Sequence, residues 1–284
     1  MSADDPAALA DRIARLLGTG DGELLVALDH DGTLSPIVGR PEDARLAPGA
    51  QEAVRDLCTV AEVAVLSGRG LDDLVARFGG LPVTLVSEHG LRVRTPDGTV
   101  DALTEELDAD VLTDVRRRLA TLLDSGRSHG GAQSGSHGGA QSGSHGGWTV
   151  EDKGVSIAVH HRLVPEDALE PTLTAVRELL AEAATAPPGG HVQKGKAVLE
   201  LRPAGAEKGA ALRELLARRP GRCPVMVGDD LTDEPALAAA EAVGGVGVLV
   251  AEDPRATAAS ARLADPSDVV RLLVELEALL RRAR

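Results

Sequence analysis

The chain has 284 residues, of which 43% are hydrophobic, so it can bury one large core or two moderate ones. Its formal net charge of −14 argues against nucleic acid or an anionic membrane as a partner, because both bind basic surfaces. Aromatic residues make up 1% of the chain and tyrosine is absent, so a ligand site must use charged and amide groups rather than aromatic stacking.

Cysteine usage and the N-terminus bear on the compartment. Cys58 and Cys223 have neither metal-ligand nor disulfide spacing, which fits a reducing environment. The acidic start, Met1–Asp5, lacks an apolar signal region, and no apolar run reaches membrane-spanning length. We therefore expect a cytoplasmic protein.

The first third of the chain alternates helices with apolar strands, which is typical of an α/β fold. The expected elements are helices at about 6–17, 49–57 and 71–78, strands at 24–28, 60–66 and 83–86, and a hairpin at 91–100 with its turn at 96–98.

The middle of the chain changes character. After a helical pattern at about 103–123, the octet Ser128–Gly135 is repeated from Ser136, and a third copy begins at Ser144. We expect a low-complexity Gly/Ser/His loop at about 125–147, because such a tract cannot bury enough apolar surface to fold. Binding of a transition metal by its histidines is an alternative to a flexible loop.

The pattern then resumes with strands at 148–151 and 155–160, a helix at 166–183, strands at 191–193 and 197–201, a helix at 209–218, strands at 225–227 and 246–250, and a helix at 269–282. The fold class predicted is α/β, with a Rossmann-like parallel sheet as the body and an inserted α+β cap. The expected limits are 1–105 and 204–284 for the body and 106–203 for the cap.

Carboxylates follow two of the predicted strands directly. Asp29 and Asp31 end the first strand, and Asp229 and Asp230 end the strand at 225–227. Ligands collect beyond the carboxyl ends of parallel strands, and Mg²⁺ prefers such oxygen ligands. The alternative for the first pair is a plain strand followed by an Asp-Gly turn.

Two further polar groups complete a possible site for a phosphoryl group. Ser67 ends the strand at 60–66, and Lys208 opens a helix. A phosphoryl group needs a nucleophile, a hydroxyl donor, a protein cation and a metal with its own acids. The alternatives are a solvated lysine at a helix start and a serine that caps the helix beginning at Leu71.

With these segments together, the chain resembles the haloacid-dehalogenase-type phosphatases and, more narrowly, the trehalose-6-phosphate phosphatases. The resemblance extends from about residue 24 to 250. The segments that carry it are Asp29–Pro36, Ser67–Arg69, Lys208–Gly209, Gly228–Glu234, Glu88–Gly90, Val150–Gly154, His160–Arg162 and Gly195–Pro203.

The resemblance implies roles for the acids. Asp29 would be the nucleophile and a metal ligand, and Asp31 would act first as general acid and then as general base, with its backbone carbonyl on Mg²⁺. Asp229 and Asp230 would also hold the metal, with Asp233 nearby; which of Asp230 and Asp233 supplies the second acid stays open.

The resemblance also implies the groups that hold the substrate. Ser67 and Lys208 would bind the phosphate oxygens. The expected sugar-binding and substrate-binding residues are Arg69, Glu88, His89, Glu151, Lys153, Arg162, Lys196 and Glu200. On residue types alone, the pair Glu151 and Lys153 could equally form a solvent-facing charged stripe.

The implied reaction is Mg²⁺-dependent hydrolysis of trehalose 6-phosphate through an aspartyl-phosphate, the last step of trehalose biosynthesis, with a functional link to the synthase and a cap that closes over the disaccharide. The alternatives are a sister phosphatase acting on sucrose 6-phosphate or a glycosyl-phosphoglycerate, and a non-catalytic sugar-phosphate sensor. One departure is His30, which replaces the aromatic residue of many relatives and whose side chain we expect to point away from the metal.

Overall fold

The structure is a computed structural model that describes residues 3–17, 23–38, 43–125, 142–195 and 197–284. The chain divides into two compact units: a body, Met1–Leu103 with Ala206–Arg284, and a cap, Thr104–Gly205. The divisions fall at 103/104 and 205/206, where the sequence indicated 105/106 and 203/204. The body is therefore discontinuous in sequence.

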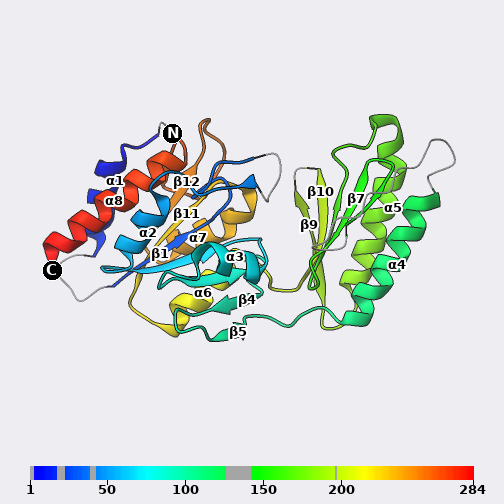
Figure 1. Ribbon diagram of the computed structural model, residues 1–284, viewed down its shortest axis with the longest axis horizontal. Coiled ribbons are helices and arrows are strands. Elements are labelled where there is room, and N and C mark those ends of the chain that lie inside the picture. The colour runs from blue at the N-terminus through cyan, green and yellow to red at the C-terminus, as the bar shows by residue number, and fades with distance from the viewer. Residues whose placement is uncertain (1–2, 18–22, 39–42, 126–141, 196) are drawn as a thin grey trace. The chain divides into compact units, whose positions relative to one another are not determined.

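The body is built on an eight-stranded sheet in the order β13-β12-β11-β1-β2-β3-β4-β5 (Figure 1). The strands from β13 to β3 run parallel, and β4 and β5 form the expected antiparallel hairpin, which lies at one edge of the sheet. The strands are β1 (Leu24–Leu28), β2 (Glu62–Leu66), β3 (Thr84–Ser87), β4 (Arg92–Arg94), β5 (Val100–Ala102), β11 (Cys223–Gly228), β12 (Val246–Val250) and β13 (Ala261–Leu263).

Helices cover both faces of this sheet (Figure 1). Those on one face share a Leu- and Val-rich core with the sheet: α1 (Pro6–Leu16), α2 (Ala50–Leu57), α3 (Leu71–Phe78) and α8 (Pro266–Ala283). The other face is covered by α6 (Lys208–Arg218) and α7 (Glu234–Ala242). The helix α7 and the strand β13 were not expected from sequence. Alanine fills much of α7, so its buried and exposed faces differ little in hydrophobicity.

The register of the central strands sets the place of the site. All five residues of β1 are buried between β11 and β2, and Leu28 pairs with Val227 on one side and Val65 on the other. In a parallel sheet the carboxyl ends of neighbouring strands meet at one edge. The chain segments after Leu28, Val227 and Val65 therefore leave the sheet together.

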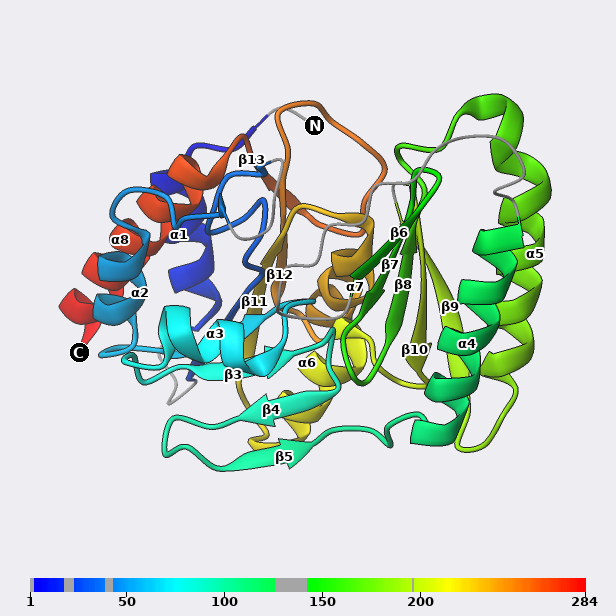
Figure 2. The same cartoon turned by 45° about the vertical axis from the view of Figure 1, so that its right-hand side comes forward.

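The cap contains a five-stranded antiparallel sheet in the order β6-β7-β8-β10-β9, with α4 and α5 side by side on one face (Figure 2). Its elements are α4 (Ala109–Ser125), β6 (Ser142–His145), β7 (Trp148–Asp152), β8 (Ile157–His160), α5 (Glu166–Ala184), β9 (Gly190–Gly195) and β10 (Val198–Pro203).

The strand β6 corrects the expectation of a loop up to residue 147. Ser142–His145 pair with β7, because antiparallel pairing uses backbone groups and needs no apolar side chains. The rest of the repeat tract, at 126–141, lies outside the described residues, and so do His129 and His137.

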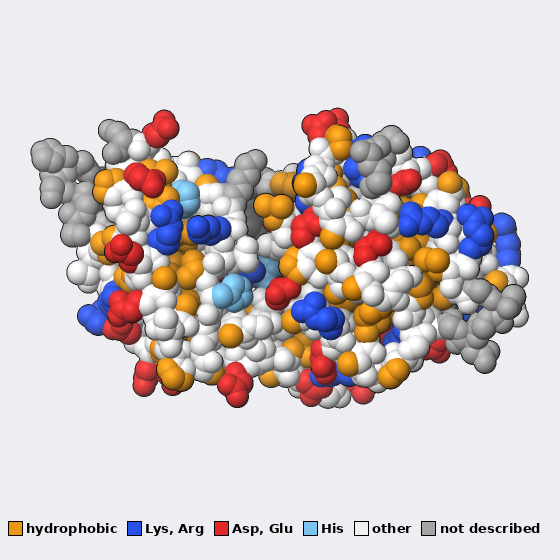
Figure 3. All heavy atoms as spheres, turned by 180° about the vertical axis from the view of Figure 1, so that it is seen from behind, with side chains coloured by type: hydrophobic (Ala, Val, Ile, Leu, Met, Phe, Trp, Pro, Cys, Tyr) orange, Lys and Arg blue, Asp and Glu red, His pale blue; other side chains and the backbone are white. Residues whose placement is uncertain are grey.

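Charge is mixed on the surface seen in Figure 3, where acidic and basic side chains lie among one another and among apolar ones. A nucleic-acid backbone is bound by a concentrated basic surface rather than by such a mixture. Within the described ranges, no helix combines the length and the apolar character that crossing a membrane requires.

The packing of α8 gives a test of the body's core. Leu272 is fully buried, whereas Val274 on the same helix is 50% exposed. Leu272→Ala should lower the free energy of unfolding by about 2–5 kcal/mol, because it leaves a cavity in the core. Val274→Ala should change it by less than about 0.5 kcal/mol. Urea unfolding of both variants checks this, and equal effects would contradict the placement of α8.

Candidate active site

A buried lysine bridges two buried aspartates at the carboxyl edge of the body sheet. The Nζ of Lys208 donates to Oδ1 of Asp29 and to Oδ1 of Asp233, each at 2.5 Å. Lys208 is 3% exposed and Asp29 is 4% exposed. The alternative of a solvated lysine at a helix start is therefore excluded.

Asp229 adds a third carboxylate to this cluster. One ligand oxygen from each of Asp29, Asp229 and Asp233 lies within 4.8 Å of the others. The Oδ1 of Asp229 is buried and has no hydrogen-bond partner among the described residues. Gly32 leaves the space for this carboxylate, because a Cβ at that position would overlap it.

Burial and repulsion govern the ionisation of the cluster. Burial raises the pKa of Asp229, and the neighbouring charges of Asp29 and Asp233 raise it further. Burial also raises the pKa of Asp29, although Lys208 partly offsets this. For Lys208, the two carboxylates outweigh the effect of burial and raise its pKa. A further positive charge at this place would relieve the repulsion among the acids.

The three carboxylates fit a hard cation such as Mg²⁺, which takes oxygen ligands, and the unpartnered Asp229 oxygen points to the same need. The sequence placed Asp230 among the expected metal ligands and left open whether it or Asp233 supplies the second acid. The structure brings Asp233 into the cluster. Asp230 is exposed and is the N-cap of the short 3₁₀ turn Leu231–Asp233. Asp233, at the end of this turn, is buried. The side chain of Asp31 also lies outside the cluster of three.

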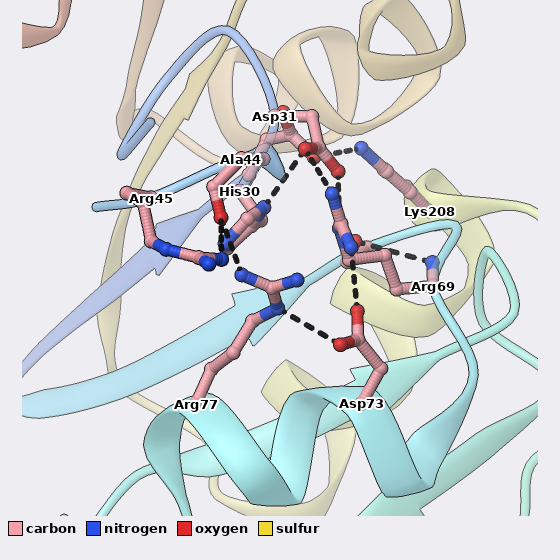
Figure 4. A network of polar contacts seen from close by, with 10 residues as sticks. His30, Asp31, Ala44, Arg45, Arg69, Asp73, Arg77 and Lys208 are labelled. Carbon is pink, nitrogen blue, oxygen red and sulfur yellow. Dashed lines mark hydrogen bonds and ion pairs between the residues drawn. The ribbon is translucent and has the colours of Figure 1, made fainter. Parts of the chain in front are cut away.

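Asp31 is held by an arginine and a histidine instead (Figure 4). Arg69 donates from Nε to Oδ2 and from Nη2 to Oδ1 of Asp31, both at 2.7 Å. The Nδ1 of His30 lies 3.1 Å from Oδ1 of Asp31. Burial opposes ionisation of Asp31, but the contacts with His30 and Arg69 outweigh it and lower the pKa of Asp31 below its usual range.

His30 is fully buried and meets Phe78 edge-on, with ring centroids 5.7 Å apart. It lies outside the carboxylate cluster, as expected, but the sequence did not reveal its contact with Asp31. Arg69 is itself held, since its Nη1 donates to Asp73 at 2.6 Å, and Arg77 donates to the same carboxylate at 3.0 Å (Figure 4). The spacing of four residues from Arg69 to Asp73 and from Asp73 to Arg77 is the sequence feature that could have indicated these two ion pairs.

The ends of β2 and β3 bring the other expected body residues to this edge. The Oγ of Ser67, which is buried, accepts from the backbone N–H of Arg69 at 3.2 Å. The cap of α3 is Gly70, so Ser67 does not cap that helix. Glu88 and His89 both have positive φ, at 48° and 61°, in the tight turn after β3. The amide N–H of His89 donates to the carbonyl of Ser67.

The cap presents polar side chains on one face of its sheet. Glu151 on β7 pairs with Ala158 on β8, and Ala158 pairs with Glu200 on β10, so the two glutamates share a face. The apolar side chains of these strands pack on the opposite face with α4 and α5. The two glutamates therefore belong to the face that those helices leave uncovered.

Hydrogen bonds organise this polar face. Glu151 bonds to His160 at 3.1 Å, and this contact lowers the pKa of Glu151. Lys153 donates to Glu200 at 3.0 Å, and Ser156 donates to the same oxygen at 2.9 Å. Glu200 is buried and is also bound by Arg202. Glu151 and Lys153 thus belong to a hydrogen-bonded network, and the alternative of a solvent-facing charged stripe is not what the structure shows.

Of the remaining expected residues, Arg162 is exposed in the turn after β8. Lys196 lies outside the described residues.

Comparison with known proteins adds to this geometry. The family model described as trehalose-phosphatase matches residues 27–125 and 142–267. The chain belongs to the trehalose-phosphatase family. It is 31% identical over 276 residues to a probable trehalose-phosphate phosphatase 3 of Oryza sativa subsp. japonica, covering 89% of this chain and 69% of that protein. The predictions of family and fold class are confirmed.

Two other matches differ in how much of the matched protein they cover. An uncharacterized glycosyl hydrolase of Mycobacterium tuberculosis is 37% identical over 273 residues, which is 91% of this chain but only 18% of that protein. The chain thus spans less than a fifth of that relative. The structure of Aspergillus fumigatus trehalose-6-phosphate phosphatase superposes with a TM-score of 0.70 at 25% identity, covering 98% of this chain and 99% of that one.

The place of Asp229 beside Gly32 can be tested with a matched glycine pair. Gly32 and Gly221 both have φ of +90°, but a Cβ meets Asp229 only at Gly32 and meets nothing within 4 Å at Gly221. Both alanine variants should lose about 1 kcal/mol of unfolding free energy through backbone strain. Gly32→Ala should also weaken Mg²⁺ binding measured by calorimetry about tenfold or more. Equal Mg²⁺ affinities would contradict this arrangement.

The raised pKa of Asp229 predicts how stability depends on pH without metal. The folded protein keeps the proton of Asp229, whereas the unfolded chain releases it near the ordinary value of 3.8. Stability from this group is therefore present below pH 4 and is lost as pH rises towards the raised pKa. Asp229→Asn removes that loss and should therefore stabilise the protein more at pH 8 than at pH 5.

The measurement is urea unfolding in a chelator at pH 5 and pH 8. Asp11→Asn, at an exposed position on α1, serves as the control for removing one carboxylate. A gain for Asp229→Asn that is the same at both pH values would contradict the assignment.

Proposed function

We propose that this chain is a Mg²⁺-dependent phosphatase that hydrolyses trehalose 6-phosphate to trehalose and phosphate, the last step of trehalose biosynthesis. The observation that carries the proposal is the buried cluster of Lys208 with Asp29, Asp229 and Asp233, in a chain of the trehalose-phosphatase family. The likeness to the Aspergillus fumigatus trehalose-6-phosphate phosphatase supports the choice of substrate.

In this proposal Asp29, Asp229 and Asp233 hold Mg²⁺, together with the backbone carbonyl of Asp31. When bound, the ion supplies positive charge next to the phosphate oxygens. Lys208 and the hydroxyl of Ser67 supply the protein's own share of that stabilisation. Lys208 already lies within hydrogen-bond distance of Asp29, so it can hold a phosphate oxygen beside the nucleophile.

The nucleophile is the carboxylate of Asp29. One of its oxygens forms a bond to phosphorus while the bond from phosphorus to the sugar oxygen breaks, and Asp31 gives that oxygen a proton. Asp31 then takes a proton from a water molecule, whose oxygen attacks the phosphorus of the aspartyl-phosphate. Inorganic phosphate leaves and Asp29 is restored.

Asp31 must gain a proton before it can act as an acid. In the free protein Arg69 and His30 keep it ionised, because they lower its pKa. An arriving phosphate competes for the guanidinium of Arg69, so the two hydrogen bonds from Arg69 to Asp31 are lost as substrate binds. The acid form of Asp31 is then favoured when it is needed.

The cap supplies the groups that bind the sugar. Carboxylates accept from pairs of hydroxyls and lysines donate to them, which suits a chain with so few aromatic residues. The sugar-binding and substrate-binding residues proposed are Arg69, Glu88, His89, Glu151, Lys153, Arg162, Lys196 and Glu200. Closure of the cap, the functional link to the synthase and the cytoplasmic location stay predictions.

Replacement of the nucleophile tests the reaction. Asp29→Asn should lower Mg²⁺-dependent phosphate release from trehalose 6-phosphate by about a thousandfold or more, because an amide cannot form the covalent intermediate. The melting temperature of the variant in a chelator controls for misfolding. A folded variant with the wild-type rate would refute the role of Asp29.

A substrate panel separates the related functions. Trehalose 6-phosphate should be turned over far faster than sucrose 6-phosphate or a glycosyl-phosphoglycerate at equal concentration. Comparable rates would favour a sister phosphatase. Binding of trehalose 6-phosphate without phosphate release in Mg²⁺ would favour a sensor.

A further inference from the structure

The loop between β12 and β13 reaches the acidic end of β11. Arg255 in this loop donates from Nη2 to the backbone carbonyl of Asp229 at 3.0 Å. Its Nη1 contacts the carboxylate of Glu234, the first residue of α7. One guanidinium therefore links the metal-site backbone to the helix that follows it.

These contacts fix the backbone of Asp229 on both sides. Its N–H donates to Oδ2 of Asp233 at 3.1 Å, and its carbonyl accepts from Arg255. With both peptide groups bound, the backbone around Asp229 has little freedom to rotate. That backbone positions the Cα–Cβ bond from which the carboxylate extends, and the Oδ1 of this carboxylate is buried without a hydrogen-bond partner among the described residues.

Glu234 anchors the arginine. Its Oε1 contacts Arg255, while its Oε2 accepts from the Oγ1 of Thr257 at 3.1 Å and from the N–H of Ala258 at 2.8 Å. Three polar groups of this loop, from Arg255, Thr257 and Ala258, thus converge on Glu234. Both Arg255 and Glu234 are only about a quarter exposed, which strengthens their contact.

We propose that Arg255 is a positioning residue that sets the orientation of Asp229 for Mg²⁺, and that Glu234 holds Arg255 in place. This inference rests on the proposed metal role of Asp229. Groups that orient a metal ligand change metal affinity by about 10–100-fold when removed, although they do not touch the ion. Neither residue contacts the carboxylate of Asp229 itself.

A purely structural role of the pair would predict a different outcome. Loss of a surface ion pair lowers the melting temperature without altering Mg²⁺ affinity in the protein that remains folded. Loss of a positioning group alters Mg²⁺ affinity even where stability hardly changes. Metal binding in the absence of substrate therefore separates the two roles.

The experiment titrates Mg²⁺ into metal-free protein by calorimetry, with no substrate present. Arg255→Met keeps the apolar stem and removes the donors, and Arg282→Met makes the same change at an exposed position of α8. We expect about tenfold weaker Mg²⁺ binding for Arg255→Met and wild-type binding for Arg282→Met. Amide exchange at 229–233 should become faster only in Arg255→Met.

The role of Glu234 is tested by a double-mutant cycle. Glu234→Ala should also weaken Mg²⁺ binding, and the double variant should bind Mg²⁺ more tightly than the product of the single effects predicts, because the residues act as a unit. Wild-type Mg²⁺ affinity in folded Arg255→Met would overturn the inference and leave the proposed phosphatase standing. If Arg255→Met binds Mg²⁺ about tenfold more weakly but the wild-type protein releases no phosphate from trehalose 6-phosphate, the inference about Arg255 is upheld and the proposed phosphatase activity is refuted.

Discussion

The active edge depends on the ammonium of Lys208, shared between Asp29 and Asp233. Three carboxylates gathered with so little water around them repel one another, and a lone buried charge costs several kcal/mol. The lysine offsets part of that cost and leaves the cluster still short of positive charge. A bound cation would relieve the repulsion that remains among the three carboxylates.

The surroundings of the individual acids give them different pKa values. Arg69 and His30 hold Asp31 ionised, whereas burial favours the protonated form of Asp229. The surroundings of Asp31 and Asp229 therefore shift the pKa values of the two carboxyl groups in opposite directions. In the proposed mechanism, such differences let one residue type serve as nucleophile, acid–base group and metal ligand at a single sheet edge.

Much of this arrangement was predictable from sequence. An apolar strand that stops at Asp29, and others that stop at Ser67 and Asp229, already imply a shared edge. Asp230 and Asp233 could not be told apart, because the intervening 3₁₀ turn decides which carboxylate turns inward. The contact of His30 with Asp31 could not be predicted. The position of the His30 ring depends on tertiary packing, here against Phe78, a residue distant in sequence.

The order of elements along the chain has a consequence for synthesis on the ribosome. The strand β1, which leads into Asp29, pairs with β11, about two hundred residues later, whereas the cap is one continuous stretch. The nascent cap can complete its contacts while β1 is paired with β2 but still lacks β11 on its other side. A chain cut short after the cap would carry Asp29 without Lys208, Asp229 and Asp233, so the cluster can assemble only after these later segments have been synthesised.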